Sequence, residues 1–444
     1  MACTITGRYA LAPGGELKED WAVRVDGDCI VATGPRQAVL AMAAPGDELL
    51  DTGDSLIAPG FCNSHMHAYG YLAHGIPVPV VPSGFDGFLR DYWWPWVEDR
   101  LDHDYIRAAT ALACVEMLKS GVTSFCDILE APNAIPGGLL AEAEVVEQAG
   151  LRAILSFEAT ERAGEANGRA GLEENASFFR MQEARRKRGE KPLVRGMMCI
   201  HTTFSCSIPF LERARTMATD LGSGLQMHLS ESVYEPVVSM RRYGKRPVAL
   251  YDEIGFLGPD ILASQCVQVS SQEIATLIRR GVRVSHMPLS NCEVGGGVAP
   301  VPDFLAAGAR LGLGSDGYIN NFFEVMRGAF LIHKAYRQDS TVMPAPTVVD
   351  LATRGGAAAM GLNAGELAPG RLADIIVVDA GTPTPITPGN AFDQYVLYRT
   401  ASDVRHVMVG GRLVVRDGRI LTLDEGEVIA RAREAARRFW KGMN

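Results

Sequence analysis

The chain has 444 residues, of which 43 are basic and 52 acidic, and its formal net charge is −9. A chain of this length can fold as about two or three domains, or as one large barrel with a small attached domain. The acidic balance, broken only by the short run RRKR at 185–188, disfavours nucleic acids and membrane surfaces as partners. A small molecule is the expected partner.

The nine cysteines are scattered and form no CxxC pair. This usage is typical of small core residues in a reducing compartment. The sequence has no N-terminal signal pattern and no apolar run of membrane-spanning length. We therefore expect a cytoplasmic protein.

The first 57 residues contain short alternating apolar pieces, such as WAVRVDGDCIVATG at 21–34. Alternation of this kind predicts half-buried strands. We expect residues 1–57 to form the first part of a β-sandwich that is completed by the other end of the chain.

Residues 58–363 repeat one pattern, in which a helical segment ends at glycine and a short apolar strand begins at once. The pattern occurs in KSG-VTSFCDI, QAG-LRAILSF, GSG-LQMHLS, RRG-VRVSHMP and AAG-ARLGLGSD. Glycine after a helix supplies the left-handed residue that ends it, and the strand that follows is typical of one buried on both faces. With LIAPGFCNSHMH, PLVRGMMCIH and DILASQCVQV the predicted strands number eight.

Eight strand–helix units in about 300 residues predict a parallel (β/α)₈ barrel, with a doubly wound open sheet as the alternative. The barrel is favoured because reactive residue types recur where the predicted strands end, and in a barrel those ends converge on one mouth. These residues are His65, His67, His201, His228, Gln265, His286 and Asp316.

The stretch PGFCNSHMH places His65 and His67 two residues apart at the end of a predicted strand. Such residues point to the same side, with Cα atoms roughly 6.5–7 Å apart. Two imidazoles so placed can converge on one divalent ion at ~2.0–2.1 Å from each nitrogen. A pair of packed core histidines is the alternative.

Two later strand ends offer further ligands. QMHLSES contains His228 and, three residues on, Glu231, so the backbone must turn after Leu229 to bring both over the mouth. LGLGSDG contains Asp316 in a glycine-rich turn. Taken alone, the glutamate could be a solvated loop residue and the aspartate a turn or helix-capping residue. Three imidazoles and one carboxylate together suit Zn²⁺ or Fe²⁺ better than Mg²⁺ or Ca²⁺.

Residues 364–444 return to strand patterns in RLADIIVVDA and VRHVMVGGRLVVRDGRI, separated by the turn-rich loop GTPTPITPGN. We expect them to complete the β-sandwich, which a final helix around EVIARAREAARRFW would close.

The stretches PGFCNSHMH, HLSES, VSHMPLSN and LGSDG, in this order, resemble the amidohydrolase superfamily. The matching branch contains cytosine deaminases and chlorohydrolases, together with guanine, S-adenosylhomocysteine and triazine hydrolases. The tail GELAPGRLADIIVVDA is similar to the closing sandwich of that branch, so the resemblance spans nearly the whole chain. FEATERAGEANG and GLEENASFF are most similar to aminohydrolases of selenium and purine catabolism.

The resemblance implies a mononuclear metal-dependent hydrolase in which His65, His67, His228 and Asp316 bind one divalent ion, Zn²⁺ or alternatively Fe²⁺. The fourth strand, MMCIHTTF, has no lysine of the kind that bridges two ions in binuclear relatives. The implied reaction is hydrolytic deamination of an amino-substituted N-heterocycle of purine, pterin or pyrimidine type. Glu231 and Asp316 would move the protons. Relatives are often homo-oligomers.

Gln265 departs from the pattern, because relatives carry histidine at this position. Glutamine donates and accepts hydrogen bonds but cannot shuttle a proton. Gln265 could position the attacking water, or His286 could take the place of the missing imidazole. Alternatively, the reaction displaces halide or sulfide, or the chain is a catalytically silent metal-binding homologue.

Substrate contacts are predicted from two further stretches. His201 ends the fourth strand, where relatives hold the substrate ring, although a packing role is the alternative. The loop FDGFLRDYWWPW should arch over the mouth, and an aromatic residue such as Trp94 could stack on a planar heterocycle. Trp96 is expected to belong to the small core of the loop itself.

Overall fold

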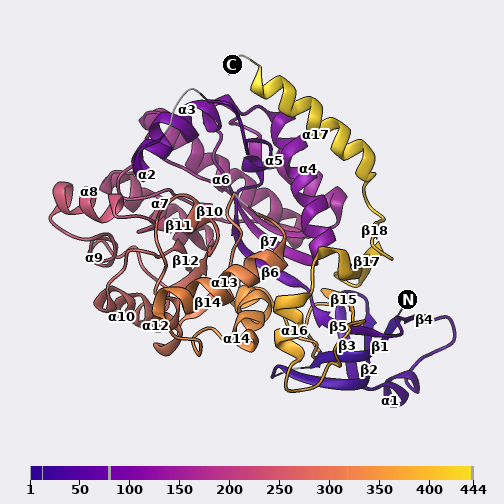
Figure 1. Ribbon diagram of the computed structural model, residues 1–444. Helices are drawn as coiled ribbons and strands as arrows, with labels where there is room; N and C mark the ends of the chain where they lie inside the picture. The colour runs from indigo at the N-terminus through magenta and orange to yellow at the C-terminus, as the bar shows by residue number, and fades with distance from the viewer. Residues whose placement is uncertain (1, 13, 79–81, 318, 442–444) are drawn as a thin grey trace.

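The computed structural model describes residues 2–12, 14–78, 82–317 and 319–441. A barrel of parallel strands surrounded by helices forms the larger part of the molecule, and strands from both chain ends form a second body beside it (Figure 1). This confirms the predicted fold class, a (β/α)₈ barrel with a small β-sandwich from both chain ends. The predicted division of the chain after residues 57 and 363 stays a prediction.

Parallel strands occupy the eight positions of the barrel, and the fourth position is interrupted at Met197. Their bounds are β6 Phe61–Met66, β7 Val122–Leu129, β8 Arg152–Phe157, β9 Val194–Gly196, β10 Met198–Cys199, β11 Leu225–Leu229, β12 Ile261–Gln265, β13 Arg283–His286 and β14 Arg310–Leu313. Every residue of β7, β8, β11 and β12 is buried, as expected for strands covered on both faces.

Two junctions close the ring of strands. β9 and β10 are halves of one strand, and they join the two parallel runs because β8 pairs with β9 and β10 with β11. At the other junction a parallel bridge joins Met66 to Asp316, and the amides of Ser315 and Asp316 donate to the carbonyl of His65 at 3.0 and 3.1 Å. The first and eighth strands are therefore neighbours, which excludes the open sheet.

Helices cover the outside of the barrel and its loops. The longer ones are α4 His103–Ser120, α5 Gly138–Ala149, α6 Glu165–Lys187, α7 Ile208–Leu221, α8 Tyr234–Tyr243, α9 Pro247–Glu253, α10 Ser271–Arg279, α12 Val301–Ala306, α13 Phe322–Arg337, α14 Ala345–Asp350 and α16 Ala391–Tyr398. The shorter ones are α1 Arg36–Leu40, α2 Gly84–Gly87, α3 Trp94–Trp96, α11 Ser290–Glu293, α15 Gly356–Met360 and single turns at 68–72, 88–93, 98–100, 351–355 and 401–403.

The predicted left-handed glycines end several of these helices. Gly121 and Gly150 have φ of 87° and 79° directly after α4 and α5. In the GSG stretch the left-handed residue is Gly222, with φ of 65°, because α7 ends two residues earlier than the pattern suggested.

The second body draws its strands from both chain ends. They are β1 Cys3–Ala12, β2 Glu16–Asp26, β3 Cys29–Pro35, β4 Glu48–Asp51, β5 Ser55–Pro59, β15 Ile375–Asp379, β16 Val404–Val409, β17 Arg412–Arg416 and β18 Arg419–Ile420. The hydrogen-bonded order is β18-β17-β16-β15-β5-β1-β2-β3, with β4 on β1. β15 pairs antiparallel with β5, so the two ends of the chain are joined directly.

The final helix, α17 Glu425–Trp440, does not close the small sheet as expected but lies along α4 of the barrel (Figure 1). The ring centroids of Phe439 and Tyr105 are 4.3 Å apart, and Nζ of Lys119 lies 3.1 Å from Glu425. The helix is amphipathic, and its buried stripe packs on the barrel because α4 offers the matching apolar face.

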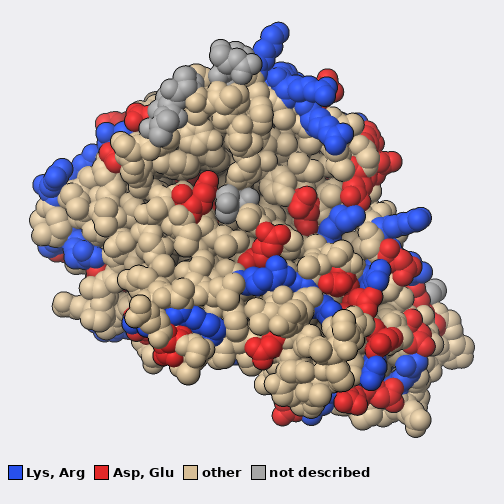
Figure 2. Space-filling model, viewed as in Figure 1, with Lys and Arg blue, Asp and Glu red and all other residues tan. Residues whose placement is uncertain are grey.

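Charged groups of both signs are spread over the face of the molecule drawn in Figure 2. Figure 2 shows lysine and arginine side chains gathered along α17, and mixed signs over much of the remaining visible face. Among the described residues, no helix is both long and apolar enough to cross a membrane. All nine cysteines are unpaired, and only Cys292 is exposed.

Candidate active site

Three histidines meet at the mouth of the barrel. His65 lies on β6, His67 follows that strand directly, and His228 lies on β11. One ring nitrogen of each lies within 4.8 Å of the others, and Nε2 of His67 is 3.2 Å from Nε2 of His228. The carbonyl of Ile128 lies 2.7 Å from Nδ1 of His67, which turns the other nitrogen toward the cluster.

The cluster has the protonation state and the spacing that a metal ion requires. Burial lowers the pKa of all three imidazoles, and neither ring nitrogen of His65 has a hydrogen-bond partner. Neutral imidazole is the form that binds metal ions. Two nitrogen ligands ~2.0–2.1 Å from a tetrahedral ion are roughly 3.4 Å apart. The 3.2 Å between the nitrogens of His67 and His228 is close to this value, so the donor set fits.

Asp316 supplies a carboxylate to the cluster. It follows β14, and its Oδ1 is 3.3 Å from Nε2 of His67. Burial alone would raise the pKa of Asp316, but the nearby imidazoles and a hydrogen bond from Gln265 hold that pKa well below its ordinary value. Asp316 is therefore an anion at neutral pH.

Gln265 ends β12 and is directed at Asp316. Its Nε2 donates to Oδ2 of Asp316 at 2.6 Å, while its Oε1 accepts a hydrogen bond from Asn291. Gln265 is not among the described residues that line the cavity at the mouth.

Left-handed turns at the strand ends aim these side chains. The φ angle is 51° at Ser230 after β11, 73° and 50° at Gln265 and Cys266, and 61° at Asp316. Non-glycine residues avoid this region, at a cost of order 1–3 kcal/mol each, and those that adopt it cluster at functional sites. The turn at Ser230 is the one that the sequence predicted after Leu229.

Glu231 follows that turn and lines the cavity. Burial and then the negative charges of Asp316 and Glu158 raise the pKa of Glu231 well above its ordinary value. Burial and neighbouring charge therefore shift Glu231 toward the protonated form and Asp316 toward the ionised form. Two carboxyl groups whose pKa values are shifted in opposite directions are typical of acid–base catalysis.

Aromatic residues form one wall of the cavity, whose volume is about 120 Å³. His201 and Trp94 both line it, with ring centroids 6.3 Å apart, and the indole Nε1 of Trp94 has no hydrogen-bond partner. Nδ1 of His201 lies 2.8 Å from Oγ of Ser205. Trp96 packs against the main hydrophobic core, and not in a separate core of its loop, and it is not one of the described lining residues.

His286 is not brought to this cavity. Its Nε2 lies 3.0 Å from Nε2 of His333 on α13, and its neighbour Ser285 points inward to Ser64 instead. Successive side chains along a strand point to opposite sides. Since Ser285 points into the barrel, His286 points outward to the surrounding helices. The structure therefore gives His286 a packing position.

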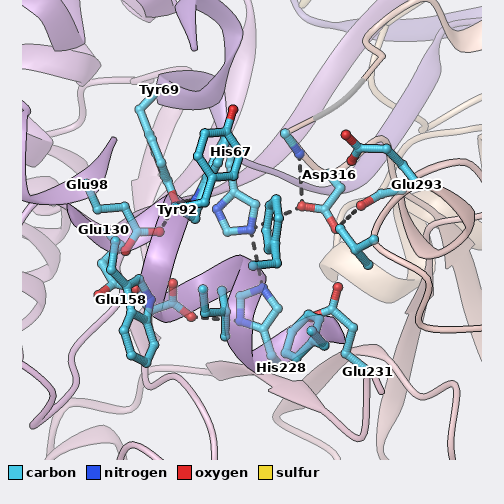
Figure 3. Close-up of a pocket in the computed structure, with 18 of the residues that line it drawn as sticks. His67, Tyr69, Tyr92, Glu98, Glu130, Glu158, His228, Glu231, Glu293 and Asp316 are labelled. Carbon is cyan, nitrogen blue, oxygen red and sulfur yellow. Dashed lines mark hydrogen bonds and ion pairs between the residues drawn. The ribbon is translucent and has the colours of Figure 1, made fainter. Parts of the chain in front are cut away.

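Sequence reasoning missed several of the acidic residues that line the cavity. Figure 3 shows Glu98, Glu130 and Glu158 on one side of the imidazoles and Asp316, Glu231 and Glu293 on the other. Glu130 and Glu158 directly follow β7 and β8, so the strand-end rule that found the histidines could also have found them. No lysine or arginine is among the described residues that line the cavity.

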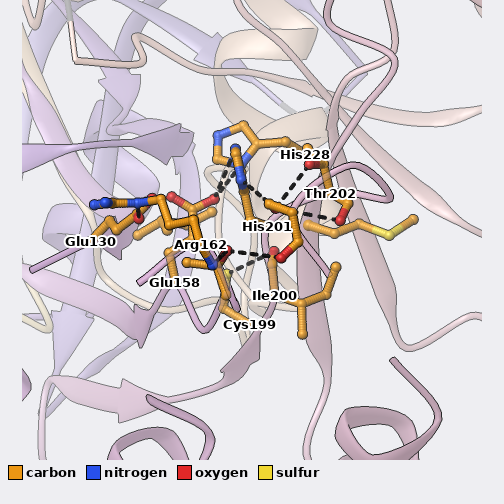
Figure 4. Close-up of polar contacts among 12 residues, drawn as sticks. Glu130, Glu158, Arg162, Cys199, Ile200, His201, Thr202 and His228 are labelled. Carbon is orange, nitrogen blue, oxygen red and sulfur yellow. Dashed lines mark hydrogen bonds and ion pairs between the residues drawn. The ribbon is translucent and has the colours of Figure 1, made fainter. Parts of the chain in front are cut away.

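Arg162 forms ion pairs with two of these lining glutamates, Glu98 and Glu130. The ion pair with Glu98 has a length of 2.8 Å, as has a further ion pair with Asp99. Oε1 of Glu158 lies 2.7 Å from Nδ1 of His228 (Figure 4). Glu158 therefore lies against the ring nitrogen of His228 that faces away from His67, on the outer side of the cluster.

Comparison with known proteins agrees with this geometry. The model of the Amidohydrolase family matches residues 56–414. The chain is 36% identical over 435 residues to a 5-methylthioadenosine/S-adenosylhomocysteine deaminase of Syntrophobacter fumaroxidans, covering 96% of this chain and 95% of the relative. It is 35% identical over 395 residues to a 5'-deoxyadenosine deaminase of Methanosarcina mazei, covering 88% of both chains.

Solved structures share the fold. A zinc-bound adenosine deaminase from Xanthomonas campestris superposes with a TM-score of 0.86 at 24% identity, covering 98% of both chains. A zinc complex of atrazine chlorohydrolase from Arthrobacter aurescens superposes with a TM-score of 0.84 at 20% identity, covering 98% of this chain and 100% of the other.

The chain belongs to the amidohydrolase family. It is a hydrolase of the class that acts on carbon–nitrogen bonds, as predicted, and its histidine cluster is a site for a divalent metal ion.

Proposed function

We propose that the protein is a mononuclear zinc-dependent deaminase that removes the exocyclic amino group from the adenine ring of a nucleoside related to 5'-deoxyadenosine. The observation that carries the proposal is the convergence of three neutral imidazoles and an anionic Asp316 on a cavity that Glu231, with its raised pKa, also lines. The deaminase relatives, identical at 35–36% of positions over most of the chain, support the adenine ring as the substrate heterocycle.

The four residues that would hold the ion are His65, His67, His228 and Asp316. A divalent ion there supplies a water of lowered pKa, near ~7, as the nucleophile. Asp316 would accept one proton from the attacking water and pass it to the departing amine, which leaves as ammonia. Glu231 would donate its proton to the ring nitrogen next to the carbon under attack and take back the proton of the new hydroxyl group as the carbonyl forms, so that both carboxyl groups return to their starting states. Overall, one water is consumed, the C–N bond breaks and a ring carbonyl replaces the amine.

The rest of the substrate is proposed to be a neutral nucleoside and not a nucleotide. Six carboxyl-bearing residues line the cavity, and no lysine or arginine is among its described lining residues. Asp316 is held as an anion, and placing a like charge beside it costs several kcal/mol, where each 1.4 kcal/mol is a factor of about ten. A phosphate would therefore meet a like charge in this cavity and no basic partner among its described lining residues.

A panel of heterocycles tests both parts of the proposal, the deamination reaction and the neutral nucleoside as substrate. Purified zinc-loaded protein is assayed for ammonia release from 5'-deoxyadenosine, 5'-methylthioadenosine, AMP, cytosine and a pterin, and for halide or sulfide release from substituted triazines. We expect ammonia from the two nucleosides, with kcat/KM at least about 100-fold above that for AMP.

The outcomes separate the alternatives. Halide or sulfide release without ammonia would replace deamination by another displacement, and no product from any compound would favour a silent homologue. Equal kcat/KM for AMP and the nucleosides would contradict the proposed preference for a neutral nucleoside, while deamination itself would stand. A cytoplasmic location and assembly into a homo-oligomer stay predictions.

A further inference from the structure

Two buried amide side chains, those of Gln265 and Asn291, form hydrogen bonds next to Asp316 at the mouth of the barrel. Gln265 and Asn291 are each only 1% exposed, and neither is among the described residues that line the cavity. They lie behind Asp316, on β12 and α11. Their role must therefore be exerted through Asp316 and not through contact with substrate.

The three side chains form a hydrogen-bonded row with a fixed direction. Nδ2 of Asn291 donates to Oε1 of Gln265, and Nε2 of Gln265 donates to Oδ2 of Asp316. An ionised carboxylate only accepts, so the amide of Gln265 must present its NH₂ group to Asp316. Its carbonyl then faces away, and the NH₂ group of Asn291 is the donor that satisfies it.

This row makes the two oxygens of Asp316 unequal. Oδ2 accepts from Gln265 at 2.6 Å and from Oγ of Ser290 at 2.9 Å. Among the described residues, Oδ1 accepts a hydrogen bond from the amide of Gly317, at 2.9 Å, and lies 3.3 Å from Nε2 of His67. One oxygen is thus tied to the protein, and the other is directed at the imidazoles.

We propose that Gln265 and Asn291 form a positioning pair, in which Asn291 fixes the amide of Gln265 so that Gln265 holds Oδ2 of Asp316 and leaves Oδ1 directed at the histidine cluster. The left-handed backbone at Gln265, with φ of 73°, supports this, because a strained conformation is retained where it places a side chain. In the zinc-loaded protein the pair orients a metal ligand without taking part in proton transfer. The positioning role does not depend on the identity of the substrate.

Two substitutions at one position separate positioning from packing. In Asn291→Asp the size is kept but the donor becomes an acceptor, so the amide of Gln265 turns around and presents its carbonyl to Asp316. In Asn291→Ala the donor is lost but nothing forces that reversal. If the pair positions Asp316, zinc affinity and kcat fall in the order wild type, Asn291→Ala, Asn291→Asp, with a loss of roughly 10- to 100-fold for the last. If Asn291 only fills space, Asn291→Asp resembles the wild type and Asn291→Ala is worse.

Zinc affinity is measured by competition with a chelator, so the readout does not require turnover. KM for 5'-deoxyadenosine, measured alongside kcat, should change little because neither residue lines the cavity. Thermal unfolding of each zinc-loaded variant reports whether the fold is kept.

A double-mutant comparison covers the case in which Asn291→Asp does not fold. Asn291 acts only through Gln265, so adding Asn291→Ala to Gln265→Leu should lower zinc affinity no further. The proposal would be overturned if Asn291→Ala lowered zinc affinity as much in the Gln265→Leu protein as in the wild type. Wild-type zinc affinity and kcat in a folded Asn291→Asp protein would also overturn it.

Discussion

The chemistry of the site rests on two carboxyl groups whose pKa values are shifted in opposite directions. Asp316 is buried among imidazoles and hydrogen-bond donors, which keep it ionised. Burial raises the pKa of Glu231, and the carboxyl groups around it raise that pKa further, toward the protonated form. The same side-chain chemistry therefore serves as a base in one position and as an acid in the other because of its surroundings.

This division gives a direct prediction for Glu231→Gln. The amide has the same size but has no acidic proton to give to the ring nitrogen, so kcat should fall by roughly 10²- to 10⁴-fold. Zinc content should stay near one per chain, because Glu231 is not among the proposed ligands. The measurement is a steady-state assay with metal analysis of the same sample.

Glu212→Gln, on the exposed face of α7, is the matched control and should keep wild-type turnover. Retained turnover in Glu231→Gln would assign the proton transfer to another group.

At the scale of elements, the carboxyl ends of the barrel strands carry the site, and this could be predicted from the sequence. His65, His228 and Asp316 were found because each closes an apolar strand. Glu130 and Glu158 obey the same rule, which could have found them, but a glutamate after a strand also has the pattern of a solvated turn residue and is less conspicuous than a histidine. The hydrogen bonds that involve Arg162 and Asn291 join distant parts of the chain, so the sequence gives no local signal for them.

The position of α17 also could not be predicted from the sequence. Its apolar stripe predicts an amphipathic helix but does not indicate which surface receives the stripe. The structure assigns it to α4, where Phe439 packs against Tyr105 and is 6% exposed.

Phe439→Ala tests how much the packing of α17 on α4 contributes to the free energy of unfolding. Removing a buried aromatic ring loses its burial and leaves a cavity, so the free energy of unfolding should fall by about 3 kcal/mol, or less if α17 shifts to fill the space. Arg433→Ala, on the exposed side of the same helix, should change it by less than about 0.5 kcal/mol. Urea titration followed by circular dichroism measures both, and equal stabilities for the two variants would show that α17 does not contribute to the fold.

At the scale of the whole molecule, the small sheet and the barrel are joined by buried contacts. Arg152, which begins β8, forms a bidentate ion pair with Asp374 beside β15, at 2.9 and 3.1 Å, and Asp374 also accepts from the amide of Gly410. Both side chains are almost fully buried, so removing either partner would leave an unpaired charge inside the protein. The sheet thereby holds the amino end of a barrel strand whose opposite end carries Glu158.

A zinc titration of chelator-treated protein tests the central claim most directly, with bound zinc and ammonia released from 5'-deoxyadenosine measured in the same samples. The account predicts no ammonia without zinc, a linear rise in rate with bound zinc, and a plateau at one ion per chain. Full turnover by the metal-free protein, or one tightly bound zinc ion per chain without ammonia release, would contradict it.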